Sequence, residues 1–190
     1  MNNLFQPYLR KFVLVFFDNI LVYSKTWKEH LTHFGQVLYV LRQNQFYAKM
    51  SKCMFGKEEV NYLGHVNSKE GVKVDPKEIK AISEWPKPTN LSKLRGFLGL
   101  AGYYQRFIQN YAHITAPLSN LLKNNAFQWN EEEEKCFEAL KKFMSTTHIL
   151  ETSYFSKPFL MECDGSSYRL GAVLMQDEHP IAFESGKLNK

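Results

Sequence analysis

The sequence contains few cysteines and no long apolar segment. The three cysteines, Cys53, Cys136 and Cys163, lie far apart and form no C-x-x-C pair, which argues against a disulfide framework and a zinc knuckle. No apolar run approaches the roughly 20 residues that a membrane helix needs. Residues 1–10 also lack the apolar core of a signal peptide. We therefore expect an intracellular protein, cytoplasmic or nuclear, with reduced thiols and no membrane partner.

Low-complexity segments and internal repeats are also absent, and the composition supports a buried core. Hydrophobic residues make up 44% of the chain and aromatic residues 15%, which excludes a disordered or collagen-like protein. The length of 190 residues suits one large domain or two small ones. The formal net charge of +5 favours a polyanionic partner, but only weakly.

Strand-like alternation of apolar residues predicts three antiparallel units. Residues 12–17 and 20–23 flank Asp18 and Asn19, which predicts a hairpin that turns on this pair, because both residues tolerate positive φ. Apolar residues on both faces predict that the hairpin is covered on both sides. The remaining strands are expected at residues 46–48, at 59–66 and 71–74 around a turn at 67–71, and in a meander at 159–163, 170–176 and 181–184.

Capping residues followed by apolar residues at helical spacing predict the helices. These helices are expected to begin after Thr26, Asp75, Asn90 (or Thr89), Thr115 and Asn130. Thr26 with Glu29, and Asn130 with Glu133, fit the capping-box pattern. The last helix is expected to bury Phe137, Leu140, Phe143 and Met144.

Asp18 and Asp164 are the candidate metal ligands. Each follows an apolar strand, where a carboxylate is held rigidly and exposed, as two-metal phosphoryl transfer requires. The alternative is that both residues simply begin turns, because Asp is among the commonest turn residues. On the pattern alone, the turn interpretation is favoured for both.

Residues 94–107 combine glycines, cations and aromatics on one predicted helix. Gly96, Gly99 and Gly102 are three residues apart, and each costs about 1 kcal/mol of helix stability relative to alanine. Such spacing indicates close approach of another backbone, either a second helix or a nucleic-acid strand, and the residues leave both open. Residues 75–125 contain seven Lys or Arg against three acids, which predicts that this segment holds most of the excess positive charge.

Several motifs resemble those of gypsy-type LTR retrotransposon Pol polyproteins. Residues 16–24 (FFDNILVYS) resemble the catalytic hairpin of their reverse transcriptases, and residues 60–66 (VNYLGHV) resemble the primer-grip hairpin. Residues 85–89 (WPKPT) and 94–108 (LRGFLGLAGYYQRFI) are similar to the thumb.

The C-terminal part resembles the ribonuclease H region of the same polyproteins. The motifs are residues 162–166 (ECDGS), 170–174 (LGAVL) and 179–185 (HPIAFES). The resemblance therefore covers essentially the whole chain, in the order of the family, and implies an α+β fold in four parts. These parts are a palm remnant with a primer-grip-like hairpin at 1–74, a helical thumb at 75–128, a connecting helix at 129–150, and the three-stranded antiparallel start of an RNase H-like fold at 151–190.

The resemblance also implies roles for individual residues. Asp18 and Asp164 would be catalytic residues that bind magnesium, and Asn19 stands where the family has a second aspartate. The nucleic-acid partner would be an RNA–DNA hybrid or duplex DNA. Its contacts would come from Tyr62, Leu63, Gly64 and His65 at the primer terminus, and from Arg95, Gly99, Tyr103 and Arg106 along the duplex.

The implied parent activity is RNA-directed DNA polymerisation with ribonuclease H. Asn19 keeps the shape of the family's aspartate but lacks its charge, and further carboxylates of both active sites are not in this sequence. We therefore expect the chain to be inactive in isolation and to work with the remainder of a Pol polyprotein. The alternative is a non-catalytic nucleic-acid-binding relic or a module reused by its host.

Overall fold

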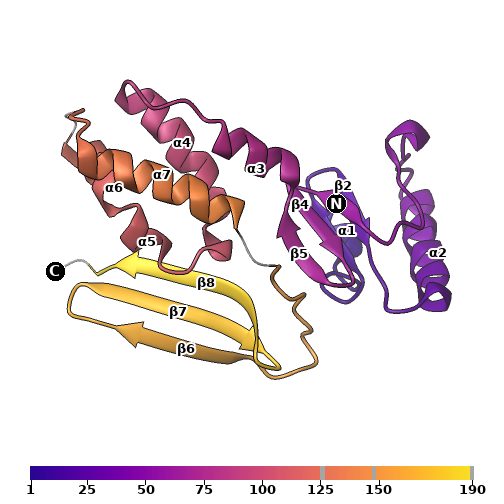
Figure 1. The fold of residues 1–190 in the computed structure, drawn as a ribbon. Helices are drawn as coiled ribbons and strands as arrows, with labels where there is room; N and C mark the ends of the chain where they lie inside the picture. Colours follow the sequence, from indigo (N-terminus) through magenta and orange to yellow (C-terminus); the bar gives the residue numbers. More distant parts are fainter. Residues whose placement is uncertain (125–126, 147–148, 189–190) are drawn as a thin grey trace. The chain divides into compact units, whose positions relative to one another are not determined.

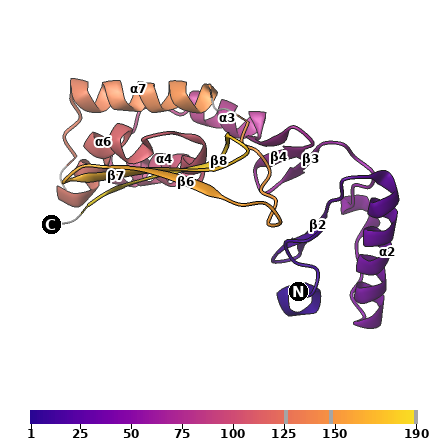
Figure 2. The same ribbon diagram turned by 90° about the horizontal axis from the view of Figure 1, so that it is seen from below.

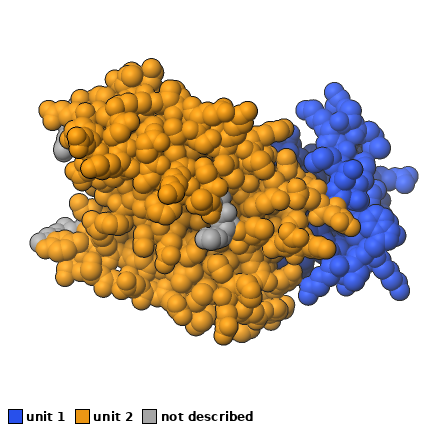
Figure 3. All heavy atoms as spheres, viewed as in Figure 1, with its two compact units in different colours: residues 1–57 blue, residues 58–190 orange. Residues whose placement is uncertain are grey.

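The computed structural model describes residues 1–124, 127–146 and 149–188. The chain divides into two compact units, residues 1–57 (unit 1) and residues 58–190 (unit 2), which are coloured separately in Figure 3. Both units mix helices with antiparallel sheets, which confirms the predicted α+β class. The fourfold domain division with its first boundary after residue 74 stays a prediction.

Unit 1 contains a two-stranded hairpin and one long helix. Its elements are α1 (Asn2–Phe5), β1 (Val13–Phe16), β2 (Asn19–Val22), α2 (Trp27–Gln43) and the 3-10 turn η1 (Met50–Lys52). The capping box that begins α2 is present, because the Glu29 amide donates to Thr26 Oγ1 and the Thr26 amide donates to Glu29 Oε2. The core is small, with Phe5, Phe12, Val13, Val37 and Leu41 buried.

Two predictions for unit 1 are wrong. The hairpin is covered on one face only: Val13 is buried, whereas Leu14 and Phe16 on the other face are 37% and 50% exposed. Residues 46–48 form no strand. Instead, Gln45 takes φ +57°, and the Phe46 amide donates to Leu41 O at 2.9 Å. This Schellman arrangement turns the chain away at the end of α2.

The first sheet of unit 2 has three strands where the sequence predicted two. The strands β3 (Val60–Tyr62), β4 (His65–Ser68) and β5 (Gly71–Val74) pair antiparallel in that order. The predicted long strand at 59–66 is broken by a two-residue turn, because Leu63 and Gly64 both adopt positive φ, +53° and +72°.

The helices of unit 2 begin close to the predicted caps. They are α3 (Pro76–Ser83), α4 (Leu91–Tyr103), η2 (Gln105–Phe107), α5 (Tyr111–Ile114), α6 (Ala116–Asn124) and α7 (Glu131–Ser145). Asp75, Asn90 and Asn130 each accept a backbone hydrogen bond from the first turn of their helices. Phe143 departs from the predicted buried stripe of α7, since it is 47% exposed.

One apolar core joins the helices of unit 2. Leu94 and Phe97 from α4 meet Phe137 and Leu140 from α7, and all four side chains are buried. Ring contacts such as Phe97–Phe137, with centroids 4.6 Å apart, fill the space between the helices. This packing fixes the position of α4 relative to α7.

The last sheet is the predicted three-stranded meander. Its strands β6 (Leu160–Gly165), β7 (Arg169–Gln176) and β8 (His179–Lys187) pair antiparallel in the order β6-β7-β8. The strand β8 lies nearest the helices, where the Ala112 amide donates to Ser185 Oγ at 2.9 Å (Figure 1). The strand β6 lies farthest from the helices in Figure 1, and all of its residues are exposed. Figure 2 views the sheet from this edge, so its three strands overlap.

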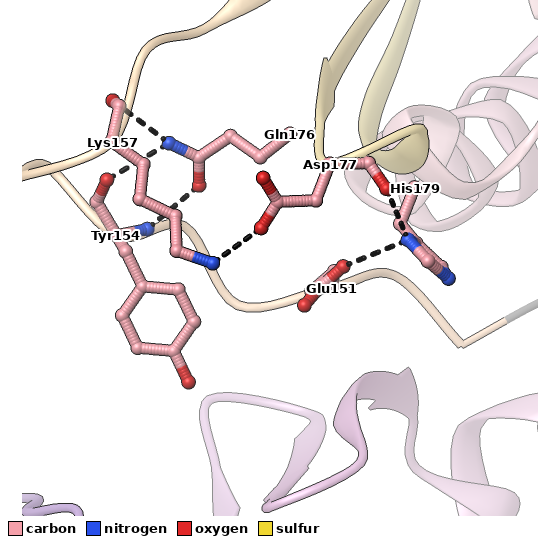
Figure 4. A network of polar contacts seen from close by, with 6 residues as sticks. All are labelled: Glu151, Tyr154, Lys157, Gln176, Asp177 and His179. Carbon is pink, nitrogen blue, oxygen red and sulfur yellow. Dashed lines mark hydrogen bonds and ion pairs between the residues drawn. The ribbon is translucent and has the colours of Figure 1, made fainter.

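The segment between α7 and β6 is tied to both sheets of unit 2. Leu150 exchanges two backbone hydrogen bonds with Val72 of β5, at 2.7 and 2.9 Å, and the Glu151 amide donates to Pro180 O at 3.0 Å. Farther along, the buried Gln176 amide bonds to both the N–H and the C=O of Tyr154, as Figure 4 shows. In the part of the chain that the structure describes, no helix is long and apolar enough to cross a membrane.

Candidate nucleic-acid interface and metal-binding hairpin

Asp18 lies in the tight turn between β1 and β2. The register pairs Phe16 with Asn19, so the turn residues are Phe17 and Asp18 and not the predicted pair Asp18–Asn19. The positive φ falls on Phe17, at +52°, and that side chain is 79% exposed. A left-handed conformation costs a bulky residue about 1 kcal/mol or more. The hairpin therefore holds the Asp18 carboxylate exposed at a strained tip.

Asp164 lies in β6, one residue before the strand ends. It faces Gly171 in the register of β6 and β7, and its side chain is exposed. Glu162, two residues earlier, shares its face of the sheet, because side chains alternate along a strand. Over residues 1–124, 127–146 and 149–188, no three His, Cys, Asp or Glu side chains gather in a way that could hold a metal ion. The described carboxylates alone therefore do not fit a two-metal site.

The turn at Leu63 and Gly64 is held mainly by residues outside its own hairpin. Leu63 O accepts hydrogen bonds from the Tyr103 hydroxyl at 2.9 Å and from His65 Nδ1 at 2.7 Å. Gly64 O accepts hydrogen bonds from the Tyr104 hydroxyl at 3.3 Å and from the Asp75 amide at 2.9 Å. Both carbonyls of the turn are thus held by two donors each, which is the full capacity of a carbonyl oxygen.

Gly64 is the residue that this arrangement requires. A Cβ at this position would lie 2.3 Å from the Tyr104 hydroxyl oxygen, far inside van der Waals contact. The φ of +72° also disfavours any residue with a Cβ. The Leu63–Gly64 turn and the end of α4 therefore fit together only with glycine in place.

His65 is buried in an aromatic cluster beside the turn. Its ring centroid lies 5.4 to 5.5 Å from those of Tyr103, Tyr104 and Phe107. Burial lowers the pKa of His65, and the Arg106 charge lowers it further, although the hydrogen bond to Leu63 O opposes both. The Arg106 guanidinium lies 5.0 Å from the Phe107 ring centroid. Hence the structure brings together residues of two motifs that the sequence presented separately.

One face of α4 is exposed along its whole length. Its residues lie three or four positions apart, which puts them on one side of a helix. We name this surface the α4 stripe, and it consists of Ser92, Arg95, Gly96, Gly99 and Tyr103, all exposed. A Cβ at Gly99 would meet nothing within 4 Å, whereas one at Gly102 would lie 3.4 Å from the Tyr111 hydroxyl. The space beside Gly102 is therefore limited by the Tyr111 side chain, while Gly99 leaves space open to solvent.

The distribution of charge differs from the prediction. Unit 1 carries eight Lys or Arg against two acids, a net charge of +6, which exceeds the +4 of residues 75–125. The expectation that the middle segment holds most of the excess positive charge is therefore wrong. All eight cations of unit 1 are exposed.

Tyr104 and Asp75 were missed as site residues. Both are largely buried, at 2% and 9% exposure, and both act through the Leu63–Gly64 turn. The available signal was the pair of adjacent tyrosines at the end of a predicted helix. The pair does not reveal its partners, since they lie 40 residues earlier in the sequence.

Two family descriptions match the chain. Residues 1–66 match the family described as reverse transcriptase (RNA-dependent DNA polymerase). Residues 129–190 match the family described as an RNase H-like domain found in reverse transcriptase. The two matches follow the order in which the sequence motifs occur.

Individual relatives agree with these matches. The chain is 40% identical, over its whole length, to the retrovirus-related Pol polyprotein from transposon 297 of Drosophila melanogaster, of which it spans 18%. Over 68% of its length it is 45% identical to an uncharacterized mitochondrial protein of Arabidopsis thaliana, of which it covers 84%. A solved structure of the foamy viral protease–reverse transcriptase in complex with double-stranded DNA matches 99% of this chain and 34% of its own, with a TM-score of 0.87 at 21% identity.

Proposed function

We propose that unit 2 binds nucleic acid for an RNA-directed DNA polymerase, because the chain belongs to the gypsy-type family of retrotransposon Pol polyproteins. The chain carries the end of the reverse transcriptase domain and the start of the RNase H-like domain. The ligand is an RNA–DNA hybrid or duplex DNA with a primer terminus. The foamy viral relative was solved with double-stranded DNA, which supports this class of ligand.

The α4 stripe is the observation that carries the proposal. It presents one cation, Arg95, and an open glycine, Gly99, on a helix whose other side is anchored in the core. A glycine without neighbours lets a sugar–phosphate backbone approach closely, and an arginine beside it binds phosphate oxygens. The Tyr103 ring, 53% exposed, adds a stacking surface at the end of the stripe.

The Leu63–Gly64 turn continues the surface of the α4 stripe. Tyr103 belongs to the stripe and also bonds to Leu63 O, so the turn and the stripe adjoin. We assign Tyr62, Leu63, Gly64 and His65 to the primer terminus, and Arg95, Gly99, Tyr103 and Arg106 to the duplex. In this assignment base pairing supplies the sequence information, and the protein contacts the backbone.

Metal-dependent catalysis is the part that the described residues support least. Reverse transcriptases and ribonucleases H use divalent metal ions held by several carboxylates. Asp18 and Asp164 are the positions that would contribute to magnesium binding, and Asn19 offers an amide in place of a charge. The function proposed for this chain is therefore binding and positioning, with catalysis dependent on further carboxylates.

Fluorescence anisotropy with a labelled RNA–DNA hybrid, at several salt concentrations, tests the proposal. The wild type should bind saturably, and the affinity should fall with salt. The double variant Arg95→Ala/Arg106→Ala should reduce the slope of log affinity against log salt by about two, because each phosphate contact contributes about one.

The matched control is Lys93→Ala/Lys123→Ala, which removes the same charge from exposed positions. Lys93 lies on α4 about 160° around the helix from Arg95, so this variant should keep the wild-type slope. Equal slopes for the two double variants would contradict the assignment of Arg95 and Arg106 to the interface.

A non-catalytic nucleic-acid-binding module is the second candidate. It is favoured because, among the described residues, no three His, Cys, Asp or Glu side chains gather to hold a metal ion, at Asp18 or elsewhere. Comparison of a recessed 3′ end with a blunt duplex of equal length separates the two candidates. A polymerase part should prefer the recessed end, whereas a general binding module should bind both equally.

A further inference from the structure

We propose that Tyr104, with Tyr103 beside it, is a positioning residue that locks the Leu63–Gly64 turn onto the end of α4. The turn and the α4 stripe then meet the primer terminus and the duplex as one rigid clamp. This inference rests on the proposed function and adds how the two contact surfaces are held in register.

The turn needs an external restraint. Leu63 is a branched residue at φ +53°, a conformation that such side chains rarely adopt. An isolated two-residue turn with leucine in this position would populate other conformations, because the strain is relieved by a change of φ. Strained residues persist where the surrounding structure over-determines them.

The restraint comes from a rigid element. Tyr104 is 2% exposed and follows directly on α4, whose Phe97 and Ala101 are fully buried in the core of unit 2. Its hydroxyl donates to Gly64 O, and the Tyr103 hydroxyl donates to Leu63 O one residue away. Two adjacent side chains therefore hold two adjacent carbonyls, which fixes both the position and the direction of the turn.

The contact is also shaped to exclude alternatives. The 2.3 Å between a Cβ at residue 64 and the Tyr104 hydroxyl oxygen means that the tyrosine occupies the space of the missing side chain. Burial raises the pKa of Tyr104 far above its usual range, with Glu78 the next cause, so its hydroxyl stays a neutral donor at physiological pH. The clamp is thus present before any ligand binds.

The chemistry of the ligand follows from this geometry. A rigid clamp fixes the spacing between the turn and Arg95, so it favours a ligand that offers a strand end and a duplex backbone at that spacing. A recessed 3′ end on a duplex provides both, whereas a blunt duplex provides only the backbone. Preorganisation of this kind raises affinity for the matching ligand by reducing the ordering cost of binding.

The test compares Tyr104→Phe with Tyr111→Phe in the full chain. Tyr104→Phe removes the hydroxyl that holds Gly64 and keeps the ring. Tyr111→Phe removes another hydroxyl that reaches α4, at Leu98 O, without touching the turn. Anisotropy gives the ratio of affinities for recessed-end and blunt duplexes, and hydrogen exchange reports the amides of residues 62–66 and Asp75 without any ligand.

We expect Tyr104→Phe to raise exchange at these amides by about tenfold, the equivalent of one lost hydrogen bond, and to abolish the recessed-end preference. Tyr111→Phe should keep both at wild-type values. Wild-type exchange and an unchanged preference in Tyr104→Phe would overturn the clamp and leave the proposed function standing. A wild type that binds neither duplex would overturn the proposed function together with the ligand role of the clamp, and the exchange data alone would then decide whether the turn is locked.

Discussion

The turn at Phe17–Asp18 in unit 1 and the turn at Leu63–Gly64 in unit 2 both place a bulky residue at positive φ. The second is held by two tyrosines, a histidine and a backbone amide. The first exposes Phe17 to 79% and takes its nearest ring contact from Phe16 in its own hairpin. A turn that is held can position a ligand in advance, whereas a strained and exposed turn depends on what binds to it.

The largest expected effect comes from Gly64→Ala, which attacks the held turn. The added Cβ would collide with the Tyr104 hydroxyl and take a strained φ. We expect unit 2 to lose about 3 kcal/mol of unfolding free energy, from overpacking together with the left-handed conformation. Urea unfolding measures the loss.

Gly99→Ala is the matched control. It adds the same methyl group in α4, where the Cβ would meet nothing within 4 Å. It should stabilise the protein by up to about 1 kcal/mol, since alanine is the better helix former. Equal effects of the two substitutions would show that the turn is not sterically held.

Acidification should weaken the held turn by a smaller amount. The pKa of His65 lies below its usual 6.5 in the folded protein, mainly because of burial. The unfolded chain therefore binds the proton more readily, and stability is lost as the pH falls below about 6.5 toward the lowered value. Unfolding free energies of wild type and His65→Gln between pH 7.5 and 5.5 measure this loss. A wild-type curve that parallels the variant would contradict it.

Phe17→Gly, in the exposed turn, should raise the stability of the protein instead of lowering it. Glycine takes positive φ without strain, and the exposed Phe17 ring contributes little burial. We expect unit 1 to gain about 1 kcal/mol of stability, measured by thermal unfolding. Leu63→Gly is the companion variant, and it should gain less, because Leu63 is only partly exposed. A larger gain in stability for Leu63→Gly than for Phe17→Gly would contradict the distinction between the two turns.

Asp18→Asn should produce the smallest effect. The described residues gather no metal-binding group, so the chain alone should extend no primer with magnesium or manganese, before or after the substitution. Primer extension with a labelled nucleotide checks this. Incorporation by the wild type that disappears in Asp18→Asn would contradict it.

The sequence predicted the features that depend on neighbouring residues. Helix starts at Thr26, Asp75 and Asn130 were correct, because a cap and its partner lie within three residues of each other. The meander of β6 to β8 was also confirmed, since alternation and polar turns are local signals.

Errors occurred where distant contacts or unusual φ values decide the structure. The turn at Leu63 and Gly64 was missed, because the tyrosines that hold it come 40 residues later. The tip of the first hairpin was displaced by one residue, since propensity favours Asp and Asn at positive φ and the structure uses Phe17. The candidate site was predicted as two separate motifs, and only tertiary packing joins them.

Leu150 and Glu151 are adjacent in the chain, yet they hydrogen-bond to different sheets, through Val72 of β5 and Pro180 of β8. The C=O and the N–H of the single peptide unit between Leu150 and Glu151 therefore hydrogen-bond to different sheets. This peptide unit is a direct link between the β3–β5 sheet and the β6–β8 sheet. Moving one sheet relative to the other would therefore break at least one of these backbone hydrogen bonds, each of which contributes about 1 kcal/mol.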